Sequence, residues 1–385
     1  MDFSESLLEF GIRIDLRQNV LSVARITLPK PFVTCQEGNY DKTVTKTLRP
    51  TINDVARAAG VSATTVSHAL NGKGRVDEAT RLRVRDAVER IGYVPSRTAR
   101  NLVTGASDTI GLLLPRFRGM SMREALGTDW YGRVAVTTSQ AILDHDRAMT
   151  LLPRLDSLSD IHRFALDGII ILDPVADDPR CSLVASAGLP HVLLGRDPAH
   201  PQTFSTSPDT EAGIQALLEH LAAQGARSIS ILATDIDWQA GRSALDTYRA
   251  WTADNHVTAD IVIAPTAECA TREAIRLAAA SAARDLLTRE SRPDAIIGLL
   301  EDFGSGIIRA ADDLSIRVPE DLLVAQDIDG LKMQLNRPSI TAVDLHPDLQ
   351  ISAAVQQLTT LIEGQVPEQH ITTPTSLHIR ESTFR

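Results

Sequence analysis

The side chains whose types and spacing point most clearly to chemistry lie between Ala63 and Asn71. Thr64, Ser67 and His68 are spaced so that one face of a helix presents them together, beside the small Ala63. Hydroxyl and imidazole groups can hydrogen-bond the edges of DNA bases, and a threonine methyl can contact thymine. The segment therefore predicts a short helix that enters the major groove. A helical hairpin without a nucleic-acid role is the alternative that this segment alone leaves open.

The flanking residues predict the elements that would position this face. Thr51 with Asp54 three residues later is typical of a capping box, and Gly60 favours the end of a helix. Ser62 is a capping candidate for the second helix. A third helix is predicted over Asp77–Ile91 and completes a helix-turn-helix. Its inward apolar stripe is predicted to consist of Leu82, Val84, Val88 and Ile91.

From Thr109 onward, short apolar runs alternate with longer helical stretches, which predicts parallel sheets covered on both faces. Strands are predicted at Ile110–Leu114, Met149–Leu152, Gly168–Leu172, His191–Leu194, Ser228–Ala233, Asp260–Ala264, Ala295–Leu300 and Leu322–Gln326. Helices are predicted at Tyr131–His145, Thr210–Gln224, Gly241–Asn255, Thr271–Arg289, Gly304–Leu314 and Leu349–Glu363. The expected class is α/β, with an all-α N-terminal headpiece and a body of two doubly wound subdomains. Such folds bind ligands at the carboxyl ends of strands.

Charge is distributed unevenly along the 385 residues. The whole chain has a net charge of -10, yet Pro50–Ser107 contains nine Lys and Arg against five Asp and Glu, which makes this stretch +4 and the remainder -14. A small basic module joined to an acidic body fits a protein whose module binds phosphate.

Several classes of protein are disfavoured. No apolar run is long enough to cross a membrane, the first residues carry Asp2, Glu5 and Glu9 where a secretory signal would be basic, and we expect a cytoplasmic location. The three cysteines are far apart, so neither a metal site nor a disulfide framework is expected. We find no phosphate-binding glycine loop, nucleophile elbow or zinc-protease motif, and expect neither an enzyme nor a cofactor.

Residues 1–49 are weakly patterned and rich in turn residues, and a poorly ordered extension is expected there. A start codon placed too far upstream is the alternative explanation.

Ordered motifs from Thr51 onward resemble the headpiece of the lac repressor family of bacterial regulators. They are Thr51-Ile52-x-Asp54-Val55-Ala56, Gly60-Val61-Ser62, Thr65-Val66-Ser67, Leu70-Asn71-Gly72 and Ile91-Gly92-Tyr93-x-Pro95. Ala99–Gly105 is similar to the family's hinge helix, and Thr109-Ile110-Gly111-Leu112 to the first strand of its effector-binding body. The resemblance implies a headpiece with hinge over residues 50–105 and a periplasmic-binding-protein-like domain for effector binding and dimerisation over 108–385.

The resemblance also implies a mechanism. Two headpieces of a homodimer would bind a near-palindromic DNA operator, and the hinge would insert Leu102 between base steps of the minor groove. The residues implied in DNA contact are Thr51, Ser62, Ala63, Thr64, Thr65, Ser67, His68, Asn71, Thr80, Arg97 and Leu102. The family commonly has arginine where this chain has His68, and a neutral imidazole cannot make the bidentate guanine contact of arginine. A variant operator is therefore expected.

For the body, the resemblance implies a small-molecule effector between the subdomains, often a sugar or nucleobase, whose binding changes DNA affinity. The implied contacts are Asp173, Arg196, Trp238, Glu301 and Asp327. Glu301 stands where the family usually has aspartate, Leu300 replaces the usual asparagine, and Ala244 replaces an arginine. These departures leave two alternatives, an atypical ligand or none. Helix capping or a surface ion pair is the competing role for each charged residue.

Dimerisation is expected through apolar faces on the helices bordering Tyr131–His145 and Asp302–Asp313. A ligand-responsive repressor is thus the leading hypothesis. A periplasmic solute-binding protein with the same body is disfavoured by the headpiece and by the acidic N-terminus, and an enzyme with an appended helix-turn-helix by the missing catalytic motifs.

Overall fold

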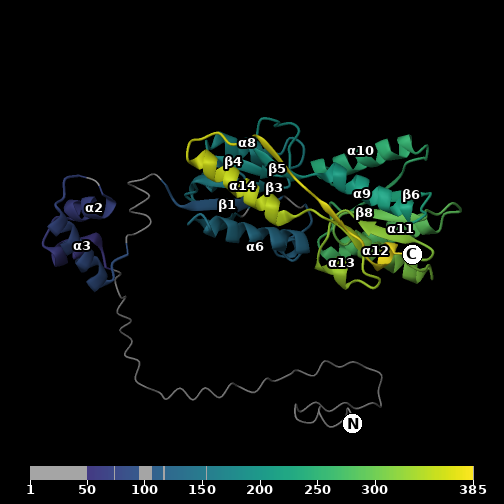
Figure 1. Cartoon of the computed structure of the whole chain (residues 1–385), viewed down its shortest axis with the longest axis horizontal. Coiled ribbons are helices and arrows are strands. Elements are labelled where there is room, and N and C mark those ends of the chain that lie inside the picture. Colours follow the sequence, from purple (N-terminus) through teal and green to yellow (C-terminus); the bar gives the residue numbers. More distant parts are fainter. Residues whose placement is uncertain (1–49, 73, 95–105, 116–117, 153, 385) are drawn as a thin grey trace, which may run out of the picture. The chain divides into compact units, whose positions relative to one another are not determined.

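The computed structural model describes residues 50–72, 74–94, 106–115, 118–152 and 154–384. The predicted N-terminal extension, Arg97, Leu102 and the rest of the hinge lie outside these residues. The chain divides into two units, Met1–Val94 and Pro95–Arg385, whose described parts are the headpiece and the body (Figure 1).

The headpiece contains three helices, α1 (Ile52–Ala59), α2 (Ala63–Asn71) and α3 (Glu78–Ile91). The predicted starts of the first two helices are confirmed. Thr51 and Asp54 form a capping box, and the Ser62 hydroxyl accepts the Thr65 N–H at 3.1 Å. Each helix ends at a glycine in the left-handed region, with φ of 68° at Gly60. The shared core consists of Val55, Ala56, Ala59, Val66, Val84, Ala87 and Tyr93.

One prediction for the third helix is wrong. Leu82 is exposed, whereas Val84 and Ala87 are fully buried and Val88 and Ile91 pack against them. The buried positions follow the spacing of one helix face, and Leu82 lies off that face because it is two residues from Val84.

The first subdomain of the body contains a six-stranded parallel sheet with the order β11-β5-β4-β3-β1-β2. Its strands are β1 (Thr109–Leu113), β2 (Ala148–Leu152), β3 (Gly168–Leu172), β4 (His191–Leu194), β5 (Ser205–Pro208) and β11 (His370–Thr373). Its helices are α5 (Met122–Leu126), α6 (Asp129–Leu143), α7 (Leu158–His162), α8 (Pro179–Ser186) and α14 (Pro347–Ile362).

The second subdomain contains a sheet with the order β12-β10-β9-β8-β6-β7, parallel except where β12 pairs with β10. Its strands are β6 (Ile229–Thr234), β7 (Asp260–Ala264), β8 (Ala295–Leu299), β9 (Leu323–Gln326), β10 (Thr341–Asp344) and β12 (Ser376–His378). Its helices are α9 (Thr210–Ala223), α10 (Gln239–Asp254), α11 (Arg272–Leu287), α12 (Phe303–Asp313), α13 (Leu331–Leu335) and the 3₁₀ turn η2 (Glu381–Thr383).

Alternation along the strands explains why both sheets are covered on two faces. In β3, Ile170 and Leu172 pack with α6 and α14, whereas Ile169 and Ile171 pack with α7 and α8. Successive strand side chains point to opposite faces, so an uninterrupted apolar run requires a layer on each side. The eight predicted strands and six predicted helices of the body are all present, and the two doubly wound subdomains are confirmed.

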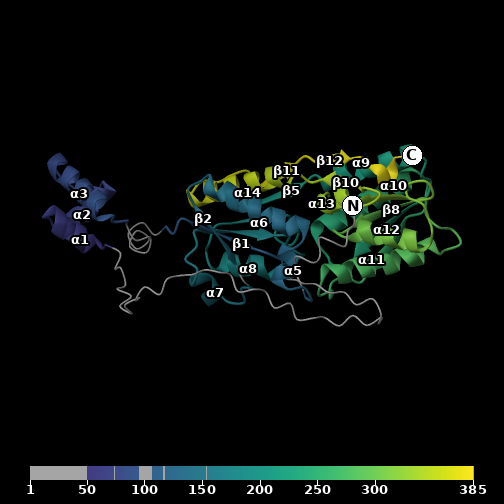
Figure 2. The same cartoon turned by 90° about the horizontal axis from the view of Figure 1, so that it is seen from below.

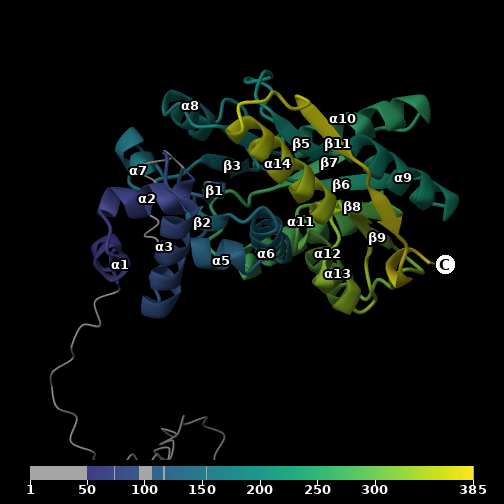
Figure 3. The same cartoon turned by 60° about the vertical axis from the view of Figure 1, so that its left-hand side comes forward.

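Three connections join the subdomains, between Pro208 and Thr210, between Asp344 and Pro347, and between Thr373 and Ser376. Figures 2 and 3 show the last of these as the yellow segment that passes from β11 to β12 along both subdomains. The connections bring the carboxyl ends of the parallel strands of both sheets to one cleft. Of the helices that the structure describes, none is sufficiently long and apolar to cross a membrane.

Candidate functional site

The second headpiece helix presents two of its polar side chains to solvent. Thr64 and His68 are exposed and lie one helical turn apart, Ser67 is half-buried, and Ala63 packs against the headpiece core. Asn71 ends the helix, and its side chain is outside what the structure describes. The exposed part of the predicted face is therefore centred on Thr64 and His68.

Other residues predicted to contact DNA are engaged in holding the helices. The Thr51 hydroxyl donates to Asp54 at 2.7 Å, and the Ser62 and Thr65 hydroxyls are 2.8 Å apart. Thr80 is buried, donates its hydroxyl to Asp77 at 2.9 Å, and accepts from Arg83 at 2.9 Å. These hydrogen bonds give Thr80 a capping role whether or not it also faces DNA.

The body contains a cavity of about 410 Å³ at the carboxyl ends of the strands, and both subdomains line it. Residues within or next to all three connections contribute to the wall, among them Asp209, Leu345 and Thr372. The five predicted effector residues are Asp173, Arg196, Trp238, Glu301 and Asp327, and the structure brings all of them to this one cavity. Their roles in binding stay predictions.

Asp173 follows β3 in the left-handed region, at φ 42°. Its carboxylate accepts the indole N–H of Trp130 at 3.2 Å and hydrogen-bonds the Tyr131 side chain. Burial raises the pKa of Asp173, and burial beside that carboxylate raises the pKa of Tyr131 well above its ordinary value. The side chain therefore binds the start of α6 from within its own subdomain.

A buried ion pair supports the backbone around Asp173. Arg180 and Asp178 are both 2% exposed, and their closest contact is 2.7 Å. The same guanidinium donates to the carbonyl of Asp173 at 3.1 Å. Arg180 therefore fixes the loop from which Asp173 projects.

Glu301 crosses the cleft to the first subdomain. One carboxylate oxygen accepts the Asp129 N–H at 2.8 Å and the other accepts the Trp130 N–H at 3.0 Å. Burial raises the pKa of Glu301, while these two hydrogen bonds lower it. Both oxygens are thus engaged by the start of α6, and a capping role accounts for the residue.

Asp327 follows β9 and accepts the Gln326 side-chain N–H at 2.7 Å. Burial raises the pKa of Asp327 to about 7. Its carboxyl group therefore exchanges a proton near neutral pH, and a hydroxyl-bearing ligand in the cavity could donate to its ionised form.

Arg196 and Trp238 lie on opposite subdomains. Arg196 is exposed, and no hydrogen bond or ion pair with another described residue engages its guanidinium. Trp238 is half-buried and pairs with Val175 in an isolated antiparallel bridge across the cleft. Its indole lies against Gly241, where an added Cβ would be 3.0 Å from Nε1. The two side chains supply a cation and an aromatic group.

Sequence reasoning missed Trp130 and Tyr131, which also line the cavity. The Thr128-Asp129 pair marks the start of a helix, with Thr128 accepting the Tyr131 N–H at 3.1 Å. That capping signal could have placed the two aromatic residues on the first turn of α6, but it does not show which cleft they face.

Comparisons with known proteins agree with this arrangement. Residues 51–96 match the model for bacterial regulatory proteins of the lacI family, and residues 218–383 match the model for a periplasmic binding protein-like domain. The HTH-type transcriptional regulator CelR of Thermobifida fusca is 28% identical over 348 residues, which cover 87% of this chain and 98% of CelR.

Two solved structures are also similar. The transcriptional regulator CelR–cellobiose complex is 25% identical with a TM-score of 0.63, covering 87% of this chain and 100% of that one. The lac repressor dimer bound to operator and the anti-inducer ONPF is 22% identical with a TM-score of 0.72, covering 87% and 99%. With the helix-turn-helix and the two doubly wound subdomains, these matches establish that the chain belongs to the lacI family of bacterial regulatory proteins.

Proposed function

We propose that this regulator is a homodimeric repressor that acts in the cytoplasm, and that a small polyhydroxy effector in the body's cleft sets its affinity for a near-palindromic operator. The observation that carries the proposal is the cavity of about 410 Å³ that both subdomains line, in a chain that also has a helix-turn-helix. A ligand that touches both subdomains favours one relative placement of them over another.

The lining favours a polyhydroxy ligand. Asp173 and Asp327 offer carboxylate oxygens that accept hydrogen bonds from hydroxyl groups, and Arg196 offers donors. Trp238 presents a flat apolar surface on which the faces of a sugar ring can pack. The volume is within the range of small-molecule sites. That the related CelR forms a complex with cellobiose supports the same class of ligand here.

On the DNA side, we assign base contacts to Thr64 and His68, which are exposed on α2. Thr51, Ser62, Thr65 and Thr80 shape the backbone around them, and the N–H groups of the capped helix ends can face phosphates. We assign residues 50–105 to the headpiece with its hinge and 108–385 to the effector body. Arg97 and Leu102 keep their predicted contacts as part of this proposal.

A dimer is supported by apolar side chains that this chain leaves exposed. Val136 and Leu143 on α6, and Leu331 and Leu335 on α13, are each 59–63% exposed. The apolar residues of α12, by contrast, are buried against α11 and the sheet, so this helix contributes less to a dimer face than the sequence indicated. The lac repressor dimer on its operator supports the same two-fold arrangement.

A genome-wide binding map of the purified protein tests the DNA half of the proposal. We expect enrichment of a near-palindromic site, and loss of that enrichment in the double variant Thr64→Ala and His68→Ala. Binding without sequence preference would contradict the proposal.

A thermal-shift series with cellobiose and other small sugars tests the effector half. We expect a sugar that raises the Tm of the wild type and raises that of Trp238→Ala much less. Because Trp251 packs on the core of the second subdomain away from the cavity, a Trp251→Phe variant should respond as the wild type does. Equal responses of Trp238→Ala and the wild type would contradict the assigned pocket.

A further inference from the structure

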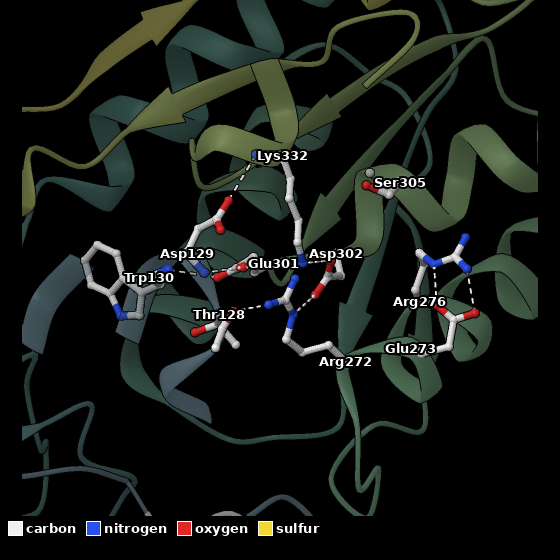
Figure 4. Close-up of polar contacts among 12 residues, drawn as sticks. Thr128, Asp129, Trp130, Arg272, Glu273, Arg276, Glu301, Asp302, Ser305 and Lys332 are labelled. Carbon is white, nitrogen blue, oxygen red and sulfur yellow. Dashed lines mark hydrogen bonds and ion pairs between the residues drawn. The ribbon is translucent and has the colours of Figure 1, made fainter. Parts of the chain in front are cut away.

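Charged side chains at the start of α6 and on the second subdomain form a continuous set of contacts across the cleft, shown in Figure 4. We call this set the cross-cleft clasp. It consists of Glu301, Asp302, Arg272 and Lys332 from the second subdomain and Gly127, Asp129 and Trp130 from the first.

Three ties make up the clasp. Glu301 accepts the N–H groups of Asp129 and Trp130 at 2.8 and 3.0 Å. In the reverse direction, the Asp129 carboxylate accepts the Lys332 backbone N–H at 3.0 Å, at the start of α13. The third tie is the hydrogen bond from the Arg272 guanidinium to the Gly127 carbonyl.

A second layer of contacts holds these groups in place. Lys332 Nζ bonds Asp302 and lies 3.8 Å from Glu301, and Arg272 Nε lies 3.5 Å from Asp302. Asp302 is 4% exposed and thus bridges the two cations within the second subdomain. The partly buried positions strengthen the attraction compared with exposed pairs, because little water screens them.

From these contacts we infer that Glu301 is a positioning residue, which fixes the relative placement of the two subdomains by capping α6 and does not itself bind the effector. The inference deepens the proposed function, since it assigns regulation of the same cleft. Both oxygens of Glu301 already accept backbone N–H groups, so a ligand that took the place of either N–H would weaken the cap.

The chemistry of the side chain fits this role. A carboxylate satisfies two N–H groups at a helix start and is favoured by the positive end of the helix dipole. Aspartate is one methylene shorter, so it cannot reach both N–H groups from the same backbone position. Glutamine keeps the reach and loses the charge, and its amide nitrogen cannot accept a hydrogen bond.

The clasp also has a consequence beyond the cleft. The helix that Glu301 caps carries Val136 and Leu143, which are exposed and belong to the proposed dimer face. A change at the clasp therefore moves the same rigid helix that the partner subunit would contact. Ligand occupancy between Asp173 and Asp327 would thereby be coupled to the dimer and its headpieces.

Hydrogen exchange of the full-length protein, followed by mass spectrometry, tests the clasp without operator or effector. In Glu301→Gln we expect exchange to be about tenfold or more faster in the peptide that covers residues 127–133, because the cap is weakened. We also expect faster exchange in the peptide that covers 330–336. The Lys332 amide in that peptide is held by Asp129 and makes no contact with Glu301.

Two further variants sharpen the result. Arg272→Met should accelerate exchange in the same two peptides, although Arg272 bonds neither the Asp129 nor the Lys332 amide. Glu273→Gln is the matched control, because Glu273 pairs with Arg276 at 2.5 Å inside the second subdomain, as Figure 4 also shows. Its exchange in both peptides should equal that of the wild type.

Acceleration confined to 127–133 in Glu301→Gln would overturn the inference, because Glu301 would then cap α6 only locally. Wild-type exchange in both Glu301→Gln and Arg272→Met would overturn it as well. Should Glu301→Gln fail to fold, Arg272→Met still tests the clasp, because acceleration in both peptides supports it and wild-type exchange in 330–336 overturns it. Failure of the proposed function is distinguishable, since a missing operator preference would leave these exchange rates unchanged.

Discussion

Gly74 lies directly against the imidazole of His68 in the headpiece. A Cβ added at Gly74 would be 2.7 Å from His68 Nδ1, and Gly74 has a φ of 73°. The loop that follows α2 therefore touches the side chain that replaces the family's usual arginine. Position 74 can control where His68 points, although it lies outside the helix that presents the exposed residues.

Substitution of Gly74 should change which base the headpiece prefers. In Gly74→Ala the imidazole has to move, so preference at one base position per half-site should relax, as it should in His68→Ala, at about 1–3 kcal/mol. Gly92→Ala is the matched control, since Gly92 has a φ of 65° and nothing within 4 Å of the added Cβ. Both glycine variants should lose similar stability from left-handed strain. Selection from a randomised half-site library measures the preference, and an unchanged preference in Gly74→Ala would refute the relationship.

Leu102 is predicted to be the wedge of the hinge, and it lies outside the described residues. Leu102→Ala should weaken binding to the specific operator about tenfold or more, which is about 1.4 kcal/mol, and should change binding to random DNA far less. The reason is that only the bent specific complex accommodates the wedge between base steps. Val94→Ala removes an exposed apolar side chain at the end of the headpiece unit and should leave both affinities unchanged. Equal losses on both DNAs, measured by fluorescence anisotropy at one salt concentration, would argue against the wedge.

The buried pair of Arg180 and Asp178 should contribute strongly to the stability of the body. Arg180→Met leaves Asp178 buried without its cation, for which a loss of about 3–5 kcal/mol in unfolding free energy is expected. The same variant should weaken effector binding, because Arg180 also holds the Asp173 carbonyl. Arg249→Met removes an exposed pair with Asp246 and should have little effect on urea unfolding. A small loss in Arg180→Met, equal to that of Arg249→Met, would contradict this account.

The apolar strands could be predicted from the sequence, because a strand that is covered on both faces consists of an uninterrupted run of apolar residues. The sequence did not predict β5 and β11, whose buried residues are polar. Ser205 hydrogen-bonds His370 at 2.7 Å, and Thr206 donates to Gln357 at 2.9 Å. Their partners are more than 150 residues away, so no local pattern indicates that these hydroxyls can be buried.

For the candidate site, the sequence predicted which carboxylates line the cavity but not the contact that each of them makes. The resemblance to the family indicated Asp173 and Asp327, which follow strands, and parallel sheets place ligands at those ends. The same resemblance placed Glu301 at the cavity as a ligand contact, whereas its pairing with the start of α6 depends on contacts 171 and 172 residues apart. Long-range packing thus decides which of two chemical roles a carboxylate at a strand end takes.

The proton on Asp327 should make the body less stable as pH rises toward neutrality. The pKa of Asp327 is raised from 3.8 to about 7, so the folded protein keeps a proton that the unfolded chain releases over this interval. From this group alone, the unfolding free energy should therefore fall by at most about 1.4 kcal/mol per pH unit between pH 3.8 and about pH 7. Above about pH 7 it should fall no further. Asp327→Asn removes the titrating group. The Tm of this variant minus the Tm of the wild type should therefore increase as the pH is raised from about 5 to about 8. Asp348→Asn alters an exposed carboxylate and should follow the wild-type pH dependence. A Tm difference between Asp327→Asn and the wild type that stays constant over this range would show that Asp327 keeps one protonation state throughout, and would contradict this pH dependence.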